Sequence, residues 1–218
     1  MDGGEHMLVS EIFKSIQGES TYAGLPSVFV RLAGCSLSCA WCDTPYARVP
    51  DGAVEMTVDA VIREVRKFNC DLVEITGGEP LEQAEAIELS RRLMDAGFKV
   101  LIETNGSVTI RGLDPRIVKI IDVKCPSSGH AGSFLIDNIP HITVDDEIKF
   151  VIGGMEDYEY AKRFIEEFLT DRTSTILFAP VRPGLEPRVL AEWILKDSLR
   201  VRFQLQIHSY IWSGERGR

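Results

Sequence analysis

Short apolar runs alternate along this chain with longer stretches whose apolar positions recur at helical spacing. The runs predict strands, because each is brief and is bounded by glycine, proline or polar residues. They lie at residues 9–16, 27–33, 71–76, 99–103, 118–123, 147–152 and 175–178. Residues 201–207 are expected to form a late strand or an extended arm.

The helical stretches each carry one apolar stripe. Thr57 is expected to cap a helix that runs to about residue 68, and Gly97 should end a second helix over residues 83–96. A third stripe covers residues 158–168, and Pro187 is well placed as the first residue of a fourth helix. Strands that alternate with helices predict an α/β fold with a mainly parallel sheet. With about six core strands but only three or four good helices, we expect a partial, modified barrel with a reduced set of outer helices.

The composition fits one globular domain. The chain has 218 residues, of which 44% are hydrophobic, and no apolar run is long enough to span a bilayer. We expect a single domain over residues 1–218, in which residues 1–7 are disordered or left over from protein expression. The N-terminus lacks the basic and apolar regions of a secretory signal. A net charge of −9 argues against broad contact with nucleic acid, so neither nucleic acid nor a membrane is an expected partner.

Three cysteines are crowded into one predicted loop. Cys35, Cys39 and Cys42 have the spacing C-x₃-C-x₂-C and follow Gly34. Three soft thiolates so close together suit an iron–sulfur cluster or zinc, and a closed site of either kind takes four protein ligands. The two remaining cysteines lie elsewhere, so one coordination position is left open, which favours chemistry over a purely structural role. Thiols that must stay free to bind iron also indicate a cytoplasmic location.

Other polar motifs follow predicted strands, so they should gather at one edge of the sheet. Gly77-Gly-Glu-Pro80 follows one strand, and Glu103-Thr-Asn105 ends the next. The cysteine spacing resembles that of the radical S-adenosylmethionine superfamily, in which three cysteines hold a [4Fe-4S] cluster and the fourth iron binds S-adenosylmethionine. This resemblance implies that the Gly77–Pro80 edge holds the amino group of that cofactor. A carboxylate, a hydroxyl and an amide at residues 103–105 could bind its ribose and sulfonium-bearing part.

Further motifs make the likeness more specific. They are Ser15-Ile-Gln-Gly-Glu19, Val28-Phe-Val-Arg-Leu-Ala-Gly-Cys35, Cys39-Ala-Trp-Cys-Asp-Thr44, Asp122-Val-Lys-Cys-Pro-Ser-Ser128 and Gln204-Leu-Gln-Ile-His-Ser-Tyr-Ile-Trp212. Together they resemble, almost end to end, the 7-carboxy-7-deazaguanine synthase family. The resemblance implies an incomplete barrel, a homodimer, and conversion of 6-carboxy-5,6,7,8-tetrahydropterin into 7-carboxy-7-deazaguanine with loss of ammonia. That reaction lies on the route to queuosine and other deazapurines.

The same resemblance implies a set of site residues. Arg31 would bind the substrate carboxylate with its guanidinium fork. The pterin edge would be read by Ile16, Gln17, Gly18 and Thr76, with Glu19 as a neighbour. The cluster would sit on the three cysteines, Mg²⁺ would bind at Thr44, and an external donor such as flavodoxin would supply electrons. S-Adenosylmethionine would contact Trp41, Cys42, Asp43, Gly78, Glu79, Glu103, Thr104, Asn105, Cys125, Pro126 and Ser127.

Three alternatives stay open at this point. A glycyl-radical-enzyme activase would share the cysteine spacing, but it would not need the Gln17-Gly-Glu motif or Arg31. A non-catalytic iron–sulfur or zinc module would explain the cysteines and leave the strand-end motifs without a purpose. A related protein with another pterin-like or purine-like substrate is the third. Lys124 is open to a structural ion-pair role, and His208 is expected to be a packed or dimer-interface residue.

Overall fold

One open sheet of nine strands organises the computed structural model, which describes residues 6–170, 174–212 and 215–217. The order across the sheet is β3-β1-β2-β4-β5-β6-β7-β8-β9, so β3 and β9 are its two edges and the barrel does not close. This confirms the partial barrel predicted from the sequence. The strands are β1 (His6–Ile16), β2 (Pro26–Leu32), β3 (Val54–Thr57), β4 (Leu72–Gly77), β5 (Lys99–Thr104), β6 (Val118–Asp122), β7 (Glu147–Ile152), β8 (Thr175–Pro180) and β9 (Arg202–Phe203).

Most of the sheet is parallel. From β2 through β9 each neighbouring pair runs in the same direction, whereas β1 pairs antiparallel with β2 and β3 pairs antiparallel with β1. The carboxyl ends of β2 and of β4 to β8 therefore meet at one edge. The motifs that follow these strands in the sequence are brought together there, as expected for this class of fold.

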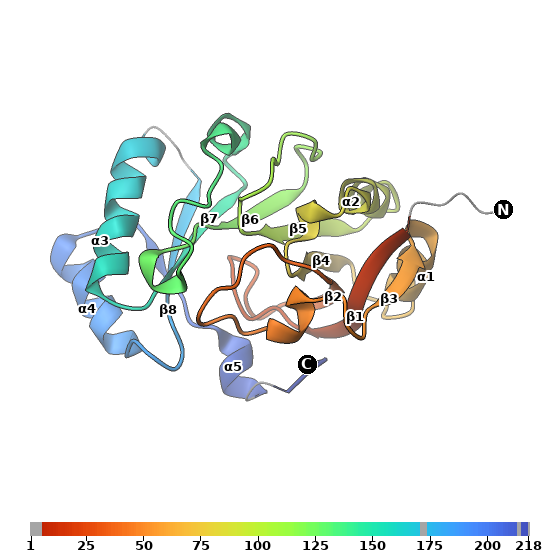
Figure 1. Ribbon diagram of the computed structural model, residues 1–218, viewed down its shortest axis with the longest axis horizontal. Helices are drawn as coiled ribbons and strands as arrows, with labels where there is room; N and C mark the ends of the chain where they lie inside the picture. The colour runs from red at the N-terminus through yellow and green to blue at the C-terminus, as the bar shows by residue number, and fades with distance from the viewer. Residues whose placement is uncertain (1–5, 171–173, 213–214, 218) are drawn as a thin grey trace.

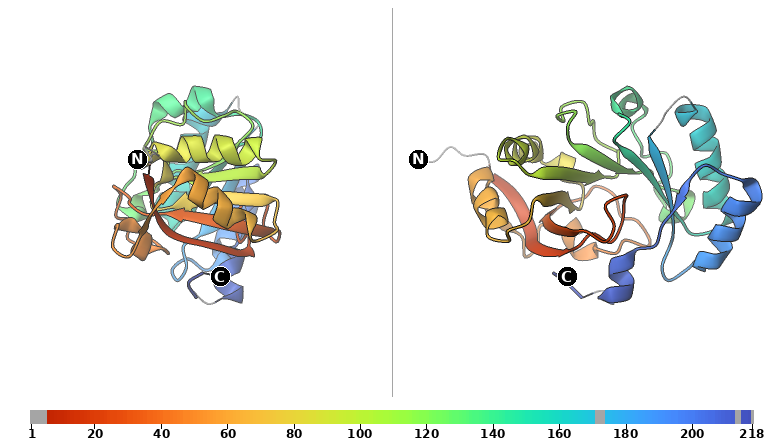
Figure 2. Two further views of the ribbon diagram at one scale, coloured as in Figure 1. Left: turned by 90° about the vertical axis from the view of Figure 1, so that its right-hand side faces the viewer. Right: turned by 180° about the vertical axis from the view of Figure 1, so that it is seen from behind.

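Four helices cover the outer, convex face of the curved sheet, and a fifth lies at its open side (Figures 1 and 2). The predicted apolar stripes face the sheet: the first helix buries Val58, Val61, Ile62 and Val65. The hydroxyl of Thr57 caps this helix by accepting a hydrogen bond from the Ala60 N–H at 3.2 Å. In the described residues no helix is long and apolar enough to cross a membrane. The helices are α1 (Val58–Arg66), α2 (Glu85–Asp95), α3 (Met155–Phe164), α4 (Pro187–Asp197) and, at the open side, α5 (Ile207–Ile211).

An aromatic cluster fills the space between β7, β8 and α3. Phe150 packs edge-to-face against Phe164 and Phe178 with ring centroids 5.6 Å apart in both pairs, and Phe134 meets Phe164 at 5.3 Å. All four rings are buried. Edge-to-face aromatic pairs add to the stabilisation that burial provides, so this cluster anchors α3 to the sheet.

Two expectations about the chain ends are corrected. Residues 6 and 7 are not outside the fold: His6 opens β1, and Met7 is fully buried against the core, because the edge strand β3 pairs with this part of β1. Residues 1–5 lie outside the described residues. Within residues 201–207 only Arg202 and Phe203 pair with β8, and Ile207 begins α5. At the start of α5 the Ile207 N–H donates to the carbonyl of Gly18 at 2.9 Å.

Candidate active site

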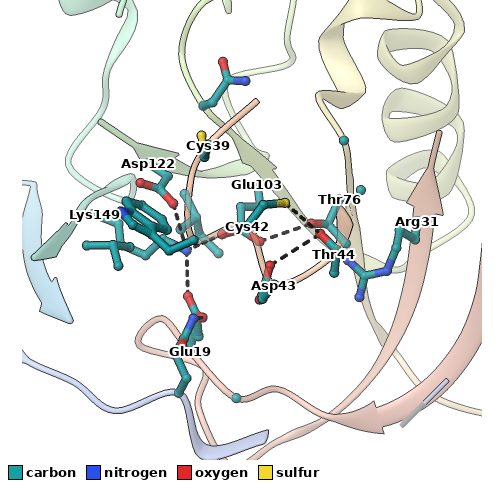
Figure 3. A pocket seen from close by; sticks show the side chains of 18 of the residues that line it. Glu19, Arg31, Cys39, Cys42, Asp43, Thr44, Thr76, Glu103, Asp122 and Lys149 are labelled. Carbon is teal, nitrogen blue, oxygen red and sulfur yellow. Dashed lines mark hydrogen bonds and ion pairs between the residues drawn. The ribbon is translucent and has the colours of Figure 1, made fainter. Parts of the chain in front are cut away.

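A cavity of about 470 Å³ opens at the carboxyl-terminal edge of the parallel strands (Figure 3). Its wall includes the loop at residues 33–48, here called the cysteine loop, which follows β2. All five predicted substrate residues line it, as do the three clustered cysteines and Thr44. Of the residues predicted for the cofactor, the ones that line the cavity are Trp41, Cys42, Asp43, Gly78, Glu103, Thr104 and Asn105.

The cysteine loop presents three thiols and no fourth one. Cys35, Cys39 and Cys42 are free, half-buried and open to the cavity, whereas among the described residues no other cysteine lines it. Cys70 donates to the carbonyl of Pro26, and Cys125 is fully buried in the core. Three soft ligands around an open space fit a cluster that keeps one iron available, and they do not fit a closed four-ligand zinc site.

Two of these thiols are disfavoured from ionising while no metal is bound. Burial raises the pKa of the Cys35 and Cys39 thiols, so each holds its proton more tightly than a free cysteine does. The ammonium of Lys124 acts in the other direction on Cys39, and the Asn105 amide lies 3.8 Å from the Cys35 sulfur. A metal ion would supply the positive charge that the thiolates need, and binding would release their protons.

Ser127 and Ser128, in the segment that follows β6, hold the cysteine loop by two hydrogen bonds. The indole N–H of Trp41 donates to the Ser127 hydroxyl at 3.0 Å, and the Ala40 N–H donates to the carbonyl of Ser128 at 3.1 Å. Ser127 is held in turn by Asp157, whose carboxylate accepts from its backbone N–H at 2.8 Å and from its hydroxyl. The segment after β6 therefore reaches the site through Trp41. Cys125, Pro126 and Ser127 do not line the cavity themselves.

The two glycines at the end of β4, Gly77 and Gly78, allow a close approach of two chain segments. A Cβ on Gly78 would lie 1.9 Å from the Gly34 carbonyl oxygen, and one on Gly77, where φ is +135°, would lie 2.1 Å from that of Leu32. The Glu79 N–H donates to the Gly34 carbonyl at 2.8 Å across this contact. Gly77 and Gly78 are thus needed so that the end of β4 can pack against the start of the cysteine loop, whether or not they also contact a ligand.

The carboxylate of Glu79 faces the protein rather than the cavity. It is 1% exposed and accepts hydrogen bonds from the N–H groups of Leu81 and Asn105 and from the Thr104 hydroxyl. Burial raises the pKa of Glu79 to about 7, although these donors act to lower it. The side chain therefore ties the ends of β4 and β5 together, and Glu79 does not line the cavity.

Arg31 is the cation of one cavity wall. Its Nε donates to Glu11 at 2.8 Å, and the hydroxyl of Tyr46 donates to the same carboxylate oxygen at 2.6 Å. Its guanidinium also lies over the Phe13 ring, 5.7 Å from the centroid. The two terminal nitrogens of the Arg31 guanidinium donate no hydrogen bond to any of the described residues. They are the groups that bind a carboxylate in two parallel hydrogen bonds.

A charged cluster around Lys149, which the sequence patterns did not predict, lies in the cavity. The ammonium of Lys149 on β7 contacts Glu19 at 2.6 Å, Asp122 at 3.5 Å, and Glu103 (Figure 3). Lys124, whose role was left open, pairs with Asp122 at 2.9 Å. The available signal was a charged residue inside an otherwise apolar strand, as in the run Glu147–Ile152. We call Lys149 and its three carboxylate partners the Lys149 cluster.

Glu74 on β4 is a further missed residue. It lines the cavity, is 3% exposed, and accepts a hydrogen bond from the side-chain amide of Gln17. Burial, and then the neighbouring charge of Glu103, raise the pKa of Glu74 well above its usual value. Burial therefore favours the neutral, protonated form of Glu74 over the carboxylate.

At the cavity mouth, His208 packs on Gly18, where a Cβ would lie 2.2 Å from its ring nitrogen. His208 is thus packed, as expected, but it also lines the cavity. Ligand atoms of Glu19, Asp43 and His208 all lie within 4.8 Å of one another, a spacing that could hold a metal ion. The hydroxyl of Thr44 lies 3.4 Å from the Asp43 carboxylate and 4.0 Å from the Cys42 sulfur.

Comparisons with known proteins agree with this geometry. The sequence model of the radical SAM superfamily matches residues 29–127. The 7-carboxy-7-deazaguanine synthase of Koribacter versatilis is 44% identical, with 96% of this chain and 98% of that protein covered. The protein of the same name from Chlorobaculum tepidum is 46% identical over 94% of each chain. The chain belongs to the 7-carboxy-7-deazaguanine synthase family.

Solved structures show the same fold. The crystal structure of QueE from Escherichia coli has a TM-score of 0.78 at 24% identity, with 93% of this chain and 95% of that chain covered. Streptococcus suis SuiB bound to precursor peptide SuiA has a TM-score of 0.60 at 14% identity, over 81% of this chain and 47% of that one. Membership in a radical SAM family implies a [4Fe-4S] cluster and S-adenosylmethionine, which the three thiols and the open cavity fit.

The close contact at Gly78 provides the first test. In Gly78→Ala the new methyl group would overlap the Gly34 carbonyl, so the start of the cysteine loop must move. We expect the free energy of unfolding to fall by about 2 kcal/mol or more, together with a large loss of iron bound after anaerobic reconstitution. Gly154→Ala is the matched control, because no atom lies within 4 Å of its Cβ position and its φ is extended. Normal iron content in Gly78→Ala would contradict the role assigned to this contact.

Proposed function

We propose that this chain is a 7-carboxy-7-deazaguanine synthase, a radical S-adenosylmethionine lyase that converts 6-carboxy-5,6,7,8-tetrahydropterin into 7-carboxy-7-deazaguanine and ammonia. The observation that carries the proposal is that the three-thiol set and the guanidinium of Arg31 open into one cavity. They do so in a chain that is 44% identical to a family member over nearly its whole length. Neither a glycyl-radical-enzyme activase nor a non-catalytic iron–sulfur module accounts for both. The product would feed the biosynthesis of queuosine or another deazapurine.

The substrate would bind with its carboxylate on Arg31. The free fork of the guanidinium suits two parallel hydrogen bonds to that group. Ile16, Gln17 and Gly18 lie at the end of β1 and in the following turn, and together with Thr76 they would read the pterin ring through backbone and side-chain hydrogen bonds. Because the cavity is lined by several carboxylates, it is also suited to a ring that carries many N–H groups.

The cofactors would share the other part of the cavity. Cys35, Cys39 and Cys42 would hold the cluster, and the backbone of Gly78 and Glu79 would accept hydrogen bonds from the amino group of S-adenosylmethionine. When bound, the cluster and S-adenosylmethionine supply a 5′-deoxyadenosyl radical. The other residues that would contact S-adenosylmethionine are Trp41, Cys42, Asp43, Glu103, Thr104 and Asn105. Cys125, Pro126 and Ser127, which the sequence also predicts for this cofactor, would act on it through the contact of Ser127 with Trp41.

Mg²⁺, an electron donor and a second subunit complete the proposal. Thr44 would bind Mg²⁺ through its hydroxyl, and since a neutral hydroxyl is a weak ligand for a hard cation, substrate oxygens and water would provide the rest. A flavodoxin-like protein would donate the electron, and the chain would act as a homodimer. Three thiols that must stay reduced support a cytoplasmic location.

The central experiment is an anaerobic turnover assay. Protein with a reconstituted cluster is incubated with S-adenosylmethionine, dithionite, Mg²⁺ and 6-carboxytetrahydropterin, and the products are identified by mass spectrometry. We expect the wild type to form 7-carboxy-7-deazaguanine, and we expect Cys39→Ala to form neither this product nor 5′-deoxyadenosine. Cys70→Ala, which changes a half-buried cysteine outside the cavity, is the control and should retain activity.

The two products separate the parts of the proposal. If 5′-deoxyadenosine accumulates while the pterin stays intact, the superfamily chemistry holds and the substrate is wrong. If neither product forms on protein with a verified cluster, the chain is not a catalyst of this class.

Arg31→Lys tests the contact with the substrate carboxylate. Lysine keeps a positive charge near Glu11 but cannot form two parallel hydrogen bonds, so the KM for 6-carboxytetrahydropterin should rise about 10- to 100-fold. The control ligand is tetrahydropterin without the carboxylate, whose binding, measured by anaerobic equilibrium dialysis, should be weak and similar for both proteins. An equal loss of affinity for the two ligands would show that Arg31 does not bind the carboxylate.

Thr44→Val tests the Mg²⁺ site. Valine has nearly the same shape but no oxygen, so the Mg²⁺ concentration that gives half-maximal turnover should rise about tenfold. Thr109→Val, at an exposed threonine outside the cavity, should leave the Mg²⁺ dependence unchanged. Identical Mg²⁺ curves for wild type and Thr44→Val would remove Thr44 from the list of ligands.

A further inference from the structure

Lys149 is a buried lysine that the chemistry described so far does not use. Its side chain is 3% exposed, and it lies on β7 with three carboxylates around its ammonium group. The three come from different elements: Glu19 from the turn after β1, Glu103 from β5 and Asp122 from β6. Burial by itself would lower the pKa of Lys149, but these carboxylates hold it well above its usual value, so the ammonium stays charged.

A second buried lysine shows what a purely structural pair looks like in this fold. Lys119 on β6 is also 3% exposed and pairs with Asp146 at 2.9 Å, but neither residue lines the cavity. Both oxygens of Asp146 are occupied within the protein, one by the Lys119 N–H and the other by the N–H and hydroxyl of Thr143. The Lys119–Asp146 pair therefore joins the start of β6 to the turn before β7, and neither residue can contact a ligand in the cavity.

The carboxylates of the Lys149 cluster differ because all three line the cavity. Glu103 is held on one oxygen by Lys149 and on the other by the Thr76 hydroxyl at 3.1 Å, while its side chain remains 29% exposed. Glu19 is held in the same way by Lys149 and by the side-chain amide of Gln206 at 2.7 Å. Each carboxylate is thus fixed at two points and still keeps lone pairs free.

Asp122 is the most enclosed carboxylate of the Lys149 cluster. One of its oxygens contacts both Lys149 and Lys124, whereas the other, Oδ1, is buried and accepts no hydrogen bond from the residues that the structure describes. A buried acceptor without a partner is costly. Buried ion pairs rarely add net stability over apolar side chains of similar volume, so stability alone gives no reason for this cluster.

We propose that Lys149 is a positioning residue for the substrate: its ammonium orients three carboxylates as hydrogen-bond acceptors for the N–H groups of a reduced pterin. The inference rests on the proposed function. It also accounts for the polarity of the cavity, in which Arg31 on β2 and Lys149 on β7 are separated by three strands of the sheet. The carboxylate end of the substrate lies at Arg31, and its N–H-rich ring lies over the Lys149 cluster.

The test compares Lys149→Met with Lys119→Met, since both remove a buried ammonium from the same sheet. Binding of 6-carboxytetrahydropterin is measured by anaerobic equilibrium dialysis on cluster-loaded protein without reductant, and KM and kcat are measured separately. In Lys149→Met the dissociation constant and KM should rise about 10- to 100-fold, with a smaller change in kcat. Lys119→Met should lower the melting temperature and leave both constants at the wild-type value.

Two further variants keep the test decisive. Lys149→Arg retains the charge and should recover part of the lost affinity. Glu19→Gln keeps the shape of one acceptor but removes its charge, so it should weaken pterin binding even if Lys149→Met does not fold. The inference is overturned if Lys149→Met or Glu19→Gln binds the pterin as the wild type does, or if Lys149→Met and Lys119→Met lose only stability. A wild type that binds no pterin would overturn the proposed substrate itself, which is a different result.

Discussion

The site depends on the close contact between Gly34, at the start of the cysteine loop, and the end of β4, where the Glu79 N–H donates a hydrogen bond to the Gly34 carbonyl. The contact exists because Gly77 and Gly78 have no side chains to keep the end of β4 away from β2. The buried carboxylate of Glu79 extends it to the end of β5 through the Asn105 N–H. Three strand ends are thereby locked together, and the thiols are presented above the cavity rather than to bulk water.

Two cations, Arg31 and Lys149, determine how charge is arranged in the cavity. Arg31 neutralises Glu11 at one wall, and Lys149 holds three carboxylates at the centre. Glu74 forms no ion pair among the described residues, and burial raises its pKa. The cavity thus offers one cationic fork and several charged acceptors, an arrangement suited to a carboxylated, N–H-rich ring.

Much of this could be predicted from the sequence, because the relevant signals are local. Apolar runs and helical stripes identified the strands from β4 to β8 and the helices α1 to α4, since periodicity depends only on neighbouring residues. The three cysteines lie within one loop, and their spacing alone indicated a three-ligand metal site. The strand-end motifs could be assigned to one edge because parallel strands necessarily bring their carboxyl ends together.

What only the tertiary structure decided involves contacts between residues distant in the chain. In the sequence, Lys149 is a charged residue within a largely apolar strand. Its partner Glu19 is separated from it by 130 positions. The sequence determined the fold class and the family to which the chain belongs, and it predicted the three clustered thiols as metal ligands. The tertiary structure decided that Glu79 faces inward, that Cys125 is buried, and that Glu74 and Lys149 share the cavity with Arg31. The physical reason is that the direction and charge state of a buried polar side chain depend on which strands lie beside it, and local spacing does not encode that arrangement.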